Sequence, residues 1–159
     1  MLRTVSSSIL RPPYAATGSV APSPPFVVLQ DKEDVDALRR AGRVAREVLE
    51  FACSLAVAGR STDSIDAEVH AAILRRNVYP APLNYRGFPK SLCASVNEEI
   101  CHGIPNDRPL ENGDIAKFDV SIYTGEGYFG DNCATVVVGG NSGTTTTTSS
   151  HISSNNSSC

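Results

Sequence analysis

The placement of charged residues most narrows which part of this chain can fold. No acidic residue precedes Asp31, and no charged residue of either sign follows Asp131. Of the 14 Lys and Arg residues only Arg3 and Arg11 lie outside this interval, so it holds 12 basic and all 17 acidic residues, a local net charge of -5. We therefore expect one folded domain that is shorter than the 159-residue chain.

This charge pattern excludes several classes of protein. The mildly acidic middle has no basic block to serve as a nucleic-acid footprint, and no apolar run approaches the roughly 18 residues needed to span a membrane. The cysteines form an odd set without a Cys-x-x-Cys pair, which fits neither a disulfide framework nor a zinc knuckle. These are Cys53, Cys93, Cys101, Cys133 and Cys159. We expect a soluble, intracellular protein with no nucleic-acid partner, and the sequence gives no signal for an oligomeric state.

The two ends of the chain differ from the middle in composition. Residues 1–25 contain arginine and serine but no acidic residue, which predicts a transit-like, disordered leader for the mitochondrion. A plastid leader and a plain disordered terminus of a cytoplasmic protein are the alternatives. Residues 139–159 are almost entirely Gly, Asn, Ser and Thr, which predicts a disordered tail, either a modified one or an extension joined where a domain was cut short. Residues 26–138 remain as the folded part.

Two helices are expected at the start of this folded part. From Asp34, as the capping residue, apolar side chains recur every three or four positions until Gly59, which suits a C-terminal cap. Ser61 or Thr62 begins a second amphipathic helix. It is expected to end near residues 77–80, at an asparagine and a proline.

Strands are expected after the helices. Short strand patterns cover residues 91–96 and 100–102, and two longer β-branched and aromatic runs cover residues 115–123 and 128–138. A Thr-Gly-Glu-Gly turn at 124–127 between the longer runs predicts a hairpin. The fold class is therefore α+β, with two helices against an antiparallel sheet.

One pair of residues in this hairpin indicates chemistry. Asp119 on the first strand and Asp131 on the second are expected on neighbouring strands, in the strings Phe-Asp-Val and Gly-Asp-Asn of two largely apolar runs. Two carboxylates that lose hydration together repel each other unless a proton or a cation lies between them. Hard oxygen ligands of this kind suit divalent Mn, Fe, Co or Zn in hydrolytic sites. A simple cation-binding hairpin is an alternative reading.

Two further features lie near this pair in the sequence. His102 precedes a Gly-Ile-Pro turn, where an imidazole can reach a substrate or a metal. Tyr85 and Phe88 lie in a loop rich in Pro and Gly, and they suit a pocket wall or a hydrophobic plug over the core equally well.

Several strings in order carry a resemblance to a known family. They are YRGFPKSLCASVNE at 85–98, CHGIP at 101–105, NGDI at 112–115, FDV at 118–120 and GD at 130–131. Between about residues 26 and 139 the chain resembles type I methionine aminopeptidase. This resemblance implies the first half of a pita-bread fold, of the creatinase and aminopeptidase kind, and removal of N-terminal methionine from nascent polypeptides.

The resemblance also implies roles for individual residues. Asp119 and Asp131 match two of five protein ligands for two divalent metal ions, Co, Mn, Fe or Zn. His102 matches a catalytic histidine that contacts the substrate near the scissile amide. Tyr85, Phe88 and Cys93 match positions that line the pocket for the methionine side chain.

Two departures from the family pattern set further expectations. Eleven residues separate Asp119 from Asp131, one more than is usual in bacterial members, and a bulge can absorb the addition. The remaining ligands, a histidine and two glutamates, have no counterpart, since Glu126 is the last glutamate and His151 lies in the predicted tail. We therefore expect a fragment that is poorly active or inactive. A non-catalytic binding module of the same fold is the alternative, although such a module has no use for a costly carboxylate pair.

Overall fold

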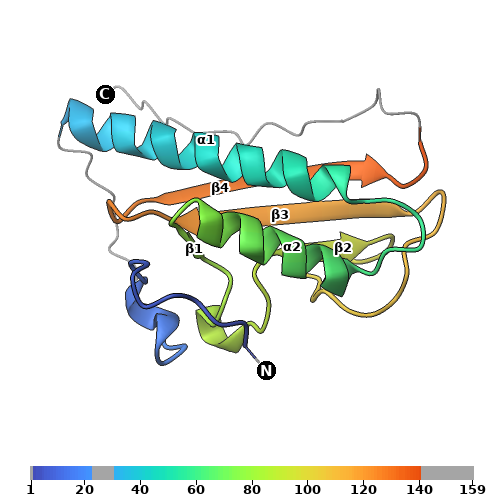
Figure 1. Cartoon of the computed structure of the whole chain (residues 1–159), viewed down its shortest axis with the longest axis horizontal. Coiled ribbons are helices and arrows are strands. Elements are labelled where there is room, and N and C mark those ends of the chain that lie inside the picture. Colours follow the sequence, from blue (N-terminus) through green and yellow to red (C-terminus); the bar gives the residue numbers. More distant parts are fainter. Residues whose placement is uncertain (1, 23–30, 141–159) are drawn as a thin grey trace, which may run out of the picture.

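The computed structural model describes residues 2–22 and 31–140 of the chain. Its main elements in chain order are α1 (Lys32–Ser54), α2 (Thr62–Arg75), β1 (Tyr79–Pro80), β2 (Cys93–Val96), β3 (Ile115–Tyr123) and β4 (Phe129–Val137). Two short 3₁₀ turns, η1 (Pro13–Ala15) and η2 (Tyr85–Gly87), complete the set. Figure 1 shows both helices running alongside the long β3–β4 hairpin. The predicted α+β class is confirmed.

All strands of the sheet pair through β3. β4 pairs with one edge of β3 along its whole length, from Ile115 opposite Val137 to Tyr123 opposite Phe129. β2 and β1 share the other edge of β3, both in the antiparallel sense. The predicted hairpin is confirmed, and its strands begin and end within one residue of the expected positions.

Alternation along β3 divides the sheet into a helix-covered face and a second face. The even-numbered side chains of β3, Ala116, Phe118, Val120 and Ile122, are buried. They form one core with Val48 and Leu49 of α1 and with Ile65, Val69 and Ile73 of α2. The odd-numbered side chains of β3, among them Asp119, therefore point away from the helices. We call this second face the cavity face.

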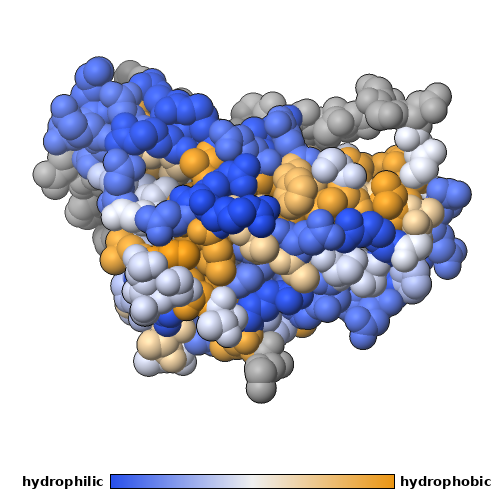
Figure 2. Space-filling model, viewed as in Figure 1, coloured by the Kyte–Doolittle hydropathy of each residue, from blue (hydrophilic) through white to orange (hydrophobic). Residues whose placement is uncertain are grey.

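The helix boundaries differ from the sequence prediction at α1. Asp31, not Asp34, caps this helix: its extended backbone lets its carboxylate accept the Asp34 N–H at 3.0 Å. The helix ends at Ser54 rather than at Gly59, and Gly59 serves the following turn with a φ of 87°. Of the two residues predicted to begin α2, Ser61 is the cap, and its hydroxyl accepts the Ser64 N–H at 3.2 Å. The amphipathic pattern of α1 is visible at its N-terminal end, whose outer surface is mainly hydrophilic (Figure 2).

The strand predicted at residues 100–102 is wrong. Ile100 is almost fully exposed and His102 has a φ of 55°, a left-handed conformation that no strand contains. Gly103 instead ties this segment to β2: its carbonyl accepts the Ala94 N–H at 2.9 Å, and its own N–H donates to Ser95 Oγ at 3.1 Å. These two hydrogen bonds join the segment to β2 at Gly103, and residues 100–102 do not pair with a neighbouring strand.

The N-terminal segment, residues 2–22, lies against the domain, whereas the composition predicted disorder. Val5 and Ile9 are buried and form a small second cluster with Tyr79 and Leu83. Burial of these apolar side chains offsets the conformational entropy that the segment loses when it is ordered. The serine-rich and proline-containing composition did not predict this burial. The proposed targeting role of the segment stays a prediction. The predicted domain start at 26 lies outside the described residues, as does the predicted tail, 139–159, except for its first two residues.

No helix among the described residues combines the length and apolar character that a membrane span requires.

Candidate functional site

The two aspartates of the hairpin lie on the cavity face of the sheet. Asp119 on β3 stands opposite Cys93 of β2, and Asp131 on β4 stands opposite Ser121 of β3. Since Ser121 is two positions from Asp119, the two carboxylates are diagonal neighbours, within reach of each other. The register of the hairpin therefore brings together the residues predicted as metal ligands.

A cavity of about 740 Å³ opens at this point of the sheet. All of the site residues predicted from the sequence line it. They are Tyr85, Phe88, Cys93, His102, Asp119 and Asp131. Its volume falls within the range of about 300–1,000 Å³ that is typical of small-molecule sites. One concave space thus joins a carboxylate pair, an imidazole and aromatic side chains.

The electrostatics of the carboxylate pair favour a proton or a cation. Burial raises the pKa of Asp119 well above its ordinary value, and the charge of Asp131 and a hydrogen bond between the two groups raise it further. His102 and Lys117 act in the opposite direction, but more weakly. Asp131 Oδ1 also accepts the Ser121 hydroxyl at 2.9 Å, which orients its carboxylate. Two acidic groups held this way gain from a shared positive charge.

His102 is positioned by the loop that precedes it. Lys117 of β3 donates its ammonium to the Ile100 carbonyl, and Glu99 Oε2 accepts the Val96 N–H at 3.0 Å. These contacts and the bonds of Gly103 hold the loop on β2 and β3, with His102 at the cavity. A Cβ on Gly103 would overlap the Ala94 carbonyl oxygen, so only glycine permits this approach.

The aromatic wall comes from the loop that contains η2. Tyr85 is 42% exposed. It and Phe88 flank Arg86 and Gly87, and these two residues and the preceding Asn84 all have positive φ values. Of the two readings left open by the composition, pocket wall and core plug, the placement of both rings along the cavity favours the first.

Sequence reasoning missed other residues of the cavity. Tyr14 and Phe129 also line it. Phe129 was read only as part of a strand. Tyr14 is the sole aromatic residue of the first 25 and directly follows Pro12 and Pro13. This isolated aromatic residue in a polar segment was the one sequence feature that could have indicated a contact between the segment and the domain.

The donor chemistry of the cavity fits part of a divalent metal site. Asp119 and Asp131 offer the hard oxygen ligands that such ions prefer. Within residues 2–22 and 31–140, however, no group of three or more His, Cys, Asp and Glu side chains is arranged to hold a metal ion. The described residues therefore contribute a carboxylate pair, not a complete ligand set.

The fold, taken with this site, identifies the class of the protein. Over 72% of the chain, its architecture superposes on 46% of a methionine aminopeptidase from Rickettsia prowazekii, with a TM-score of 0.69 and 41% identity. A methionine aminopeptidase from Thermotoga maritima superposes over the same shares with a TM-score of 0.67 and 26% identity. These are pita-bread structures, which confirms the predicted fold. The chain belongs to metallopeptidase family M24, whose family model matches residues 36–151.

Two individual relatives are named mitochondrial methionine aminopeptidases. The chain is 52% identical over 109 residues to methionine aminopeptidase 1D, mitochondrial, of Dictyostelium discoideum, covering 69% of this chain and 27% of that protein. It is 45% identical over 131 residues to the protein of the same name from Danio rerio, covering 82% and 38%. The predicted resemblance is confirmed. The chain spans roughly a third of the length of these relatives, as the shares of 27% and 38% show.

Proposed function

We propose that this chain carries part of the active site of a metal-dependent aminopeptidase that removes N-terminal methionine from polypeptides. The observation that supports this proposal most strongly is the convergence of Asp119, Asp131, His102 and the aromatic loop on one cavity. The similarity to proteins named methionine aminopeptidase agrees with it. The names of the mitochondrial relatives also support an organellar location.

Each part of the cavity has a distinct role in this proposal. Asp119 and Asp131 would hold a divalent metal ion, Co, Mn, Fe or Zn, and a complete ligand set would hold two ions. Such an ion, when bound, supplies Lewis acidity toward a peptide carbonyl and makes water nucleophilic at neutral pH. His102 donates or accepts a hydrogen bond at the substrate amide, because its ring lies at the same cavity.

Side-chain selection falls to the apolar part of the cavity. Tyr85, Phe88 and Cys93 present two aromatic rings and a thiol to the bound residue. Burial raises the pKa of Cys93 to about 12, so the thiol stays neutral and acts as a small apolar wall. A flexible thioether side chain suits such a surface through contacts of sulfur with aromatic rings.

Ligand binding tests this proposal without requiring turnover. We expect the 159-residue chain to bind L-methioninamide more tightly than L-lysinamide in a titration followed by ¹H–¹⁵N NMR, with shifts at residues of the cavity. Phe88→Ala is expected to weaken methioninamide binding. Phe51→Ala is the control, because Phe51 of α1 is partly buried against the main core and does not line the cavity. Equal affinity for the two amides would contradict the proposal.

The catalytic and non-catalytic readings differ in what the aspartates do. We expect turnover by this chain to be low, because the described residues supply only two ligands. Binding of methioninamide without any binding of Mn²⁺ at Asp119 and Asp131 would favour the non-catalytic module instead.

A further inference from the structure

The N-terminal segment is anchored to α2 through Arg3 and Thr4. Arg3 Nε lies 2.5 Å from the carboxylate of Asp66, which is fully buried. The Thr4 carbonyl accepts a hydrogen bond from His70 Nε2 at 3.0 Å, because a carbonyl can only accept. His70 Nδ1 therefore accepts the Ser91 hydroxyl at 2.7 Å. Asp66 and His70 also hold the residues that lead into β2, so one polar cluster fixes both the segment and the strand that carries Cys93.

The same segment is tied to the aromatic loop at its other end. The hydroxyl of Tyr14 donates to the Ala81 carbonyl at 2.6 Å. Asn84 Nδ2 donates to the Ala15 carbonyl at 3.0 Å, and the Arg86 N–H donates to the Gly18 carbonyl at 3.1 Å. Three hydrogen bonds thus connect residues 14–18 to the loop that forms the cavity wall.

The ring of Tyr14 is itself part of that wall. It is only 6% exposed, and it meets the ring of Tyr85 edge to face, with centroids 5.2 Å apart and an interplanar angle of 89°. Such pairs prefer this geometry, and they restrict the orientation of both rings. Tyr85 is much more exposed, at 42%, and its ring contacts the Tyr14 ring and the Arg86 guanidinium, whose carbon lies 5.7 Å from the ring centroid.

The aromatic loop needs this support because its backbone is unfavourable. Asn84 and Arg86 have φ values of 62° and 50°, a region that side chains with a Cβ adopt at a cost. Both residues donate hydrogen bonds to the N-terminal segment. The segment therefore stabilises the conformation in which Tyr85 and Phe88 face the cavity.

We propose that Tyr14, held in place by the rest of the N-terminal segment, is a built-in part of the cavity wall and a specificity-determining residue, which limits the size of the side chain that the aromatic loop accepts. This inference rests on the proposed function for the identity of the ligand. It assigns to the N-terminal segment a role in recognition that its composition does not suggest. Tyr14 contributes its ring to the cavity, and it also positions Tyr85 through the edge-to-face contact.

The test compares three variants of the 159-residue chain with one control. Tyr14→Ala removes the ring, Tyr14→Leu keeps buried volume without an aromatic edge, and Tyr14→Phe removes only the bond to Ala81. Val5→Ala is the matched control, since Val5 is buried in the same segment but does not line the cavity. Dissociation constants for L-methioninamide and for the bulkier L-phenylalaninamide are measured by NMR, together with hydrogen exchange at the Arg86 amide.

We expect Tyr14→Ala to weaken methioninamide binding about twofold to tenfold, the loss that corresponds to one aromatic pair. We expect it also to raise the affinity for phenylalaninamide relative to methioninamide and to speed exchange at Arg86. We expect Tyr14→Leu to shift the same ratio, so this variant serves as the test if Tyr14→Ala does not fold. Tyr14→Phe is expected to leave the ratio unchanged. Val5→Ala changes thermal stability without changing the ratio.

Two results would overturn the inference. One is an unchanged ligand ratio and unchanged Arg86 exchange in the alanine and leucine variants. The other is an equal change of ratio in Val5→Ala, because a purely structural role would act alike at both positions. If the unmodified chain binds neither amide, the proposed function fails, and the inference fails with it as far as specificity is concerned. Exchange at Arg86 then still decides whether the segment supports the loop.

Discussion

Replacing Gly130 by alanine tests how the helix layer places the metal-ligating strand. Gly130 precedes Asp131 on β4, directly under α1. A Cβ at this position would overlap the carbonyl oxygen of Ala41 and lie 2.5 Å from its carbonyl carbon. Both atoms belong to the backbone of α1, so no side-chain rotation can relieve the contact. The helix or the strand must shift.

The size of the effect follows from the cost of overpacking. Inserting a methyl group into a closely packed interior costs about 1–3 kcal/mol. For a domain of this size each kcal/mol lowers the melting temperature by about 4 °C, so we expect a decrease of about 4–12 °C. Because the strand shift reaches Asp131, we also expect weaker divalent-ion binding.

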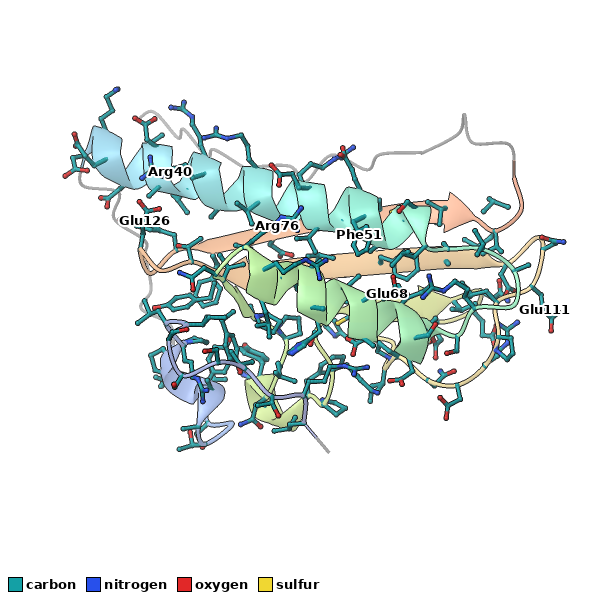
Figure 3. All side chains as sticks on the ribbon, viewed as in Figure 1. Arg40, Phe51, Glu68, Arg76, Glu111 and Glu126 are labelled. Atoms are coloured by element: carbon teal, nitrogen blue, oxygen red, sulfur yellow. The ribbon has the colours of Figure 1, made fainter. Side chains whose placement is uncertain are left out.

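Gly125→Ala is the matched control in the same hairpin. No atom lies within 4 Å of a Cβ at Gly125, and its φ is not positive. The neighbouring turn residue Glu126 pairs with Arg40 of α1 at 2.7 Å (Figure 3), so the turn stays anchored in this variant. Thermal unfolding followed by circular dichroism measures both variants. Equal melting temperatures for Gly130→Ala and Gly125→Ala would mean that the close approach of Gly130 to α1 does not restrict the side chain at this position.

Three further predictions concern the supports of the cavity. Asp66→Asn is expected to lower the free energy of unfolding by about 1.5–3 kcal/mol, because Arg3 loses its short contact with the buried carboxylate and keeps only the more exposed Asp63 as a charge partner. Asp36→Asn, at a partly exposed site, should cost about 0–1 kcal/mol, and equal losses in denaturant melts would be inconsistent with this. Burial lowers the pKa of His70 below its ordinary value of 6.5, so the unfolded chain binds the proton more readily and His70 should reduce stability as the pH falls below that value. An NMR titration giving a pKa at or above 6.5 would contradict this. Gly103→Ala should displace His102 and lower the affinity for methioninamide, and an unchanged dissociation constant would show that the close approach to β2 is unimportant.

Local patterns were enough to predict the hairpin and the carboxylate pair. Asp119 and Asp131 lie in long β-branched runs around a Gly-containing turn, so period-two alternation sets which face they occupy. The amphipathic spacing of the helices was equally direct. The capping residue of α1 was misplaced by three positions, because Asp31 and Asp34 are both good caps and only the backbone at Asp31 decides between them.

Features that depend on distant contacts could not be predicted. The position of Tyr14 results from hydrogen bonds to residues 67 or more positions away, such as Ala81, and no local pattern encodes these. His102 was assigned to a strand because its neighbours are apolar or β-branched, whereas Gly103 fixes a left-handed loop there. In both cases tertiary contacts override local propensity.

Binding of Mn²⁺ to the unmodified chain shows whether Asp119 and Asp131 form a metal site, because a paramagnetic ion broadens the NMR signals of the groups around it. We predict that the broadening centres on the amides next to Asp119 and Asp131 and that it disappears in the double variant Asp119→Asn and Asp131→Asn. Broadening centred elsewhere, or broadening that persisted at β3 and β4 after both carboxylates were replaced, would contradict a metal site at Asp119 and Asp131.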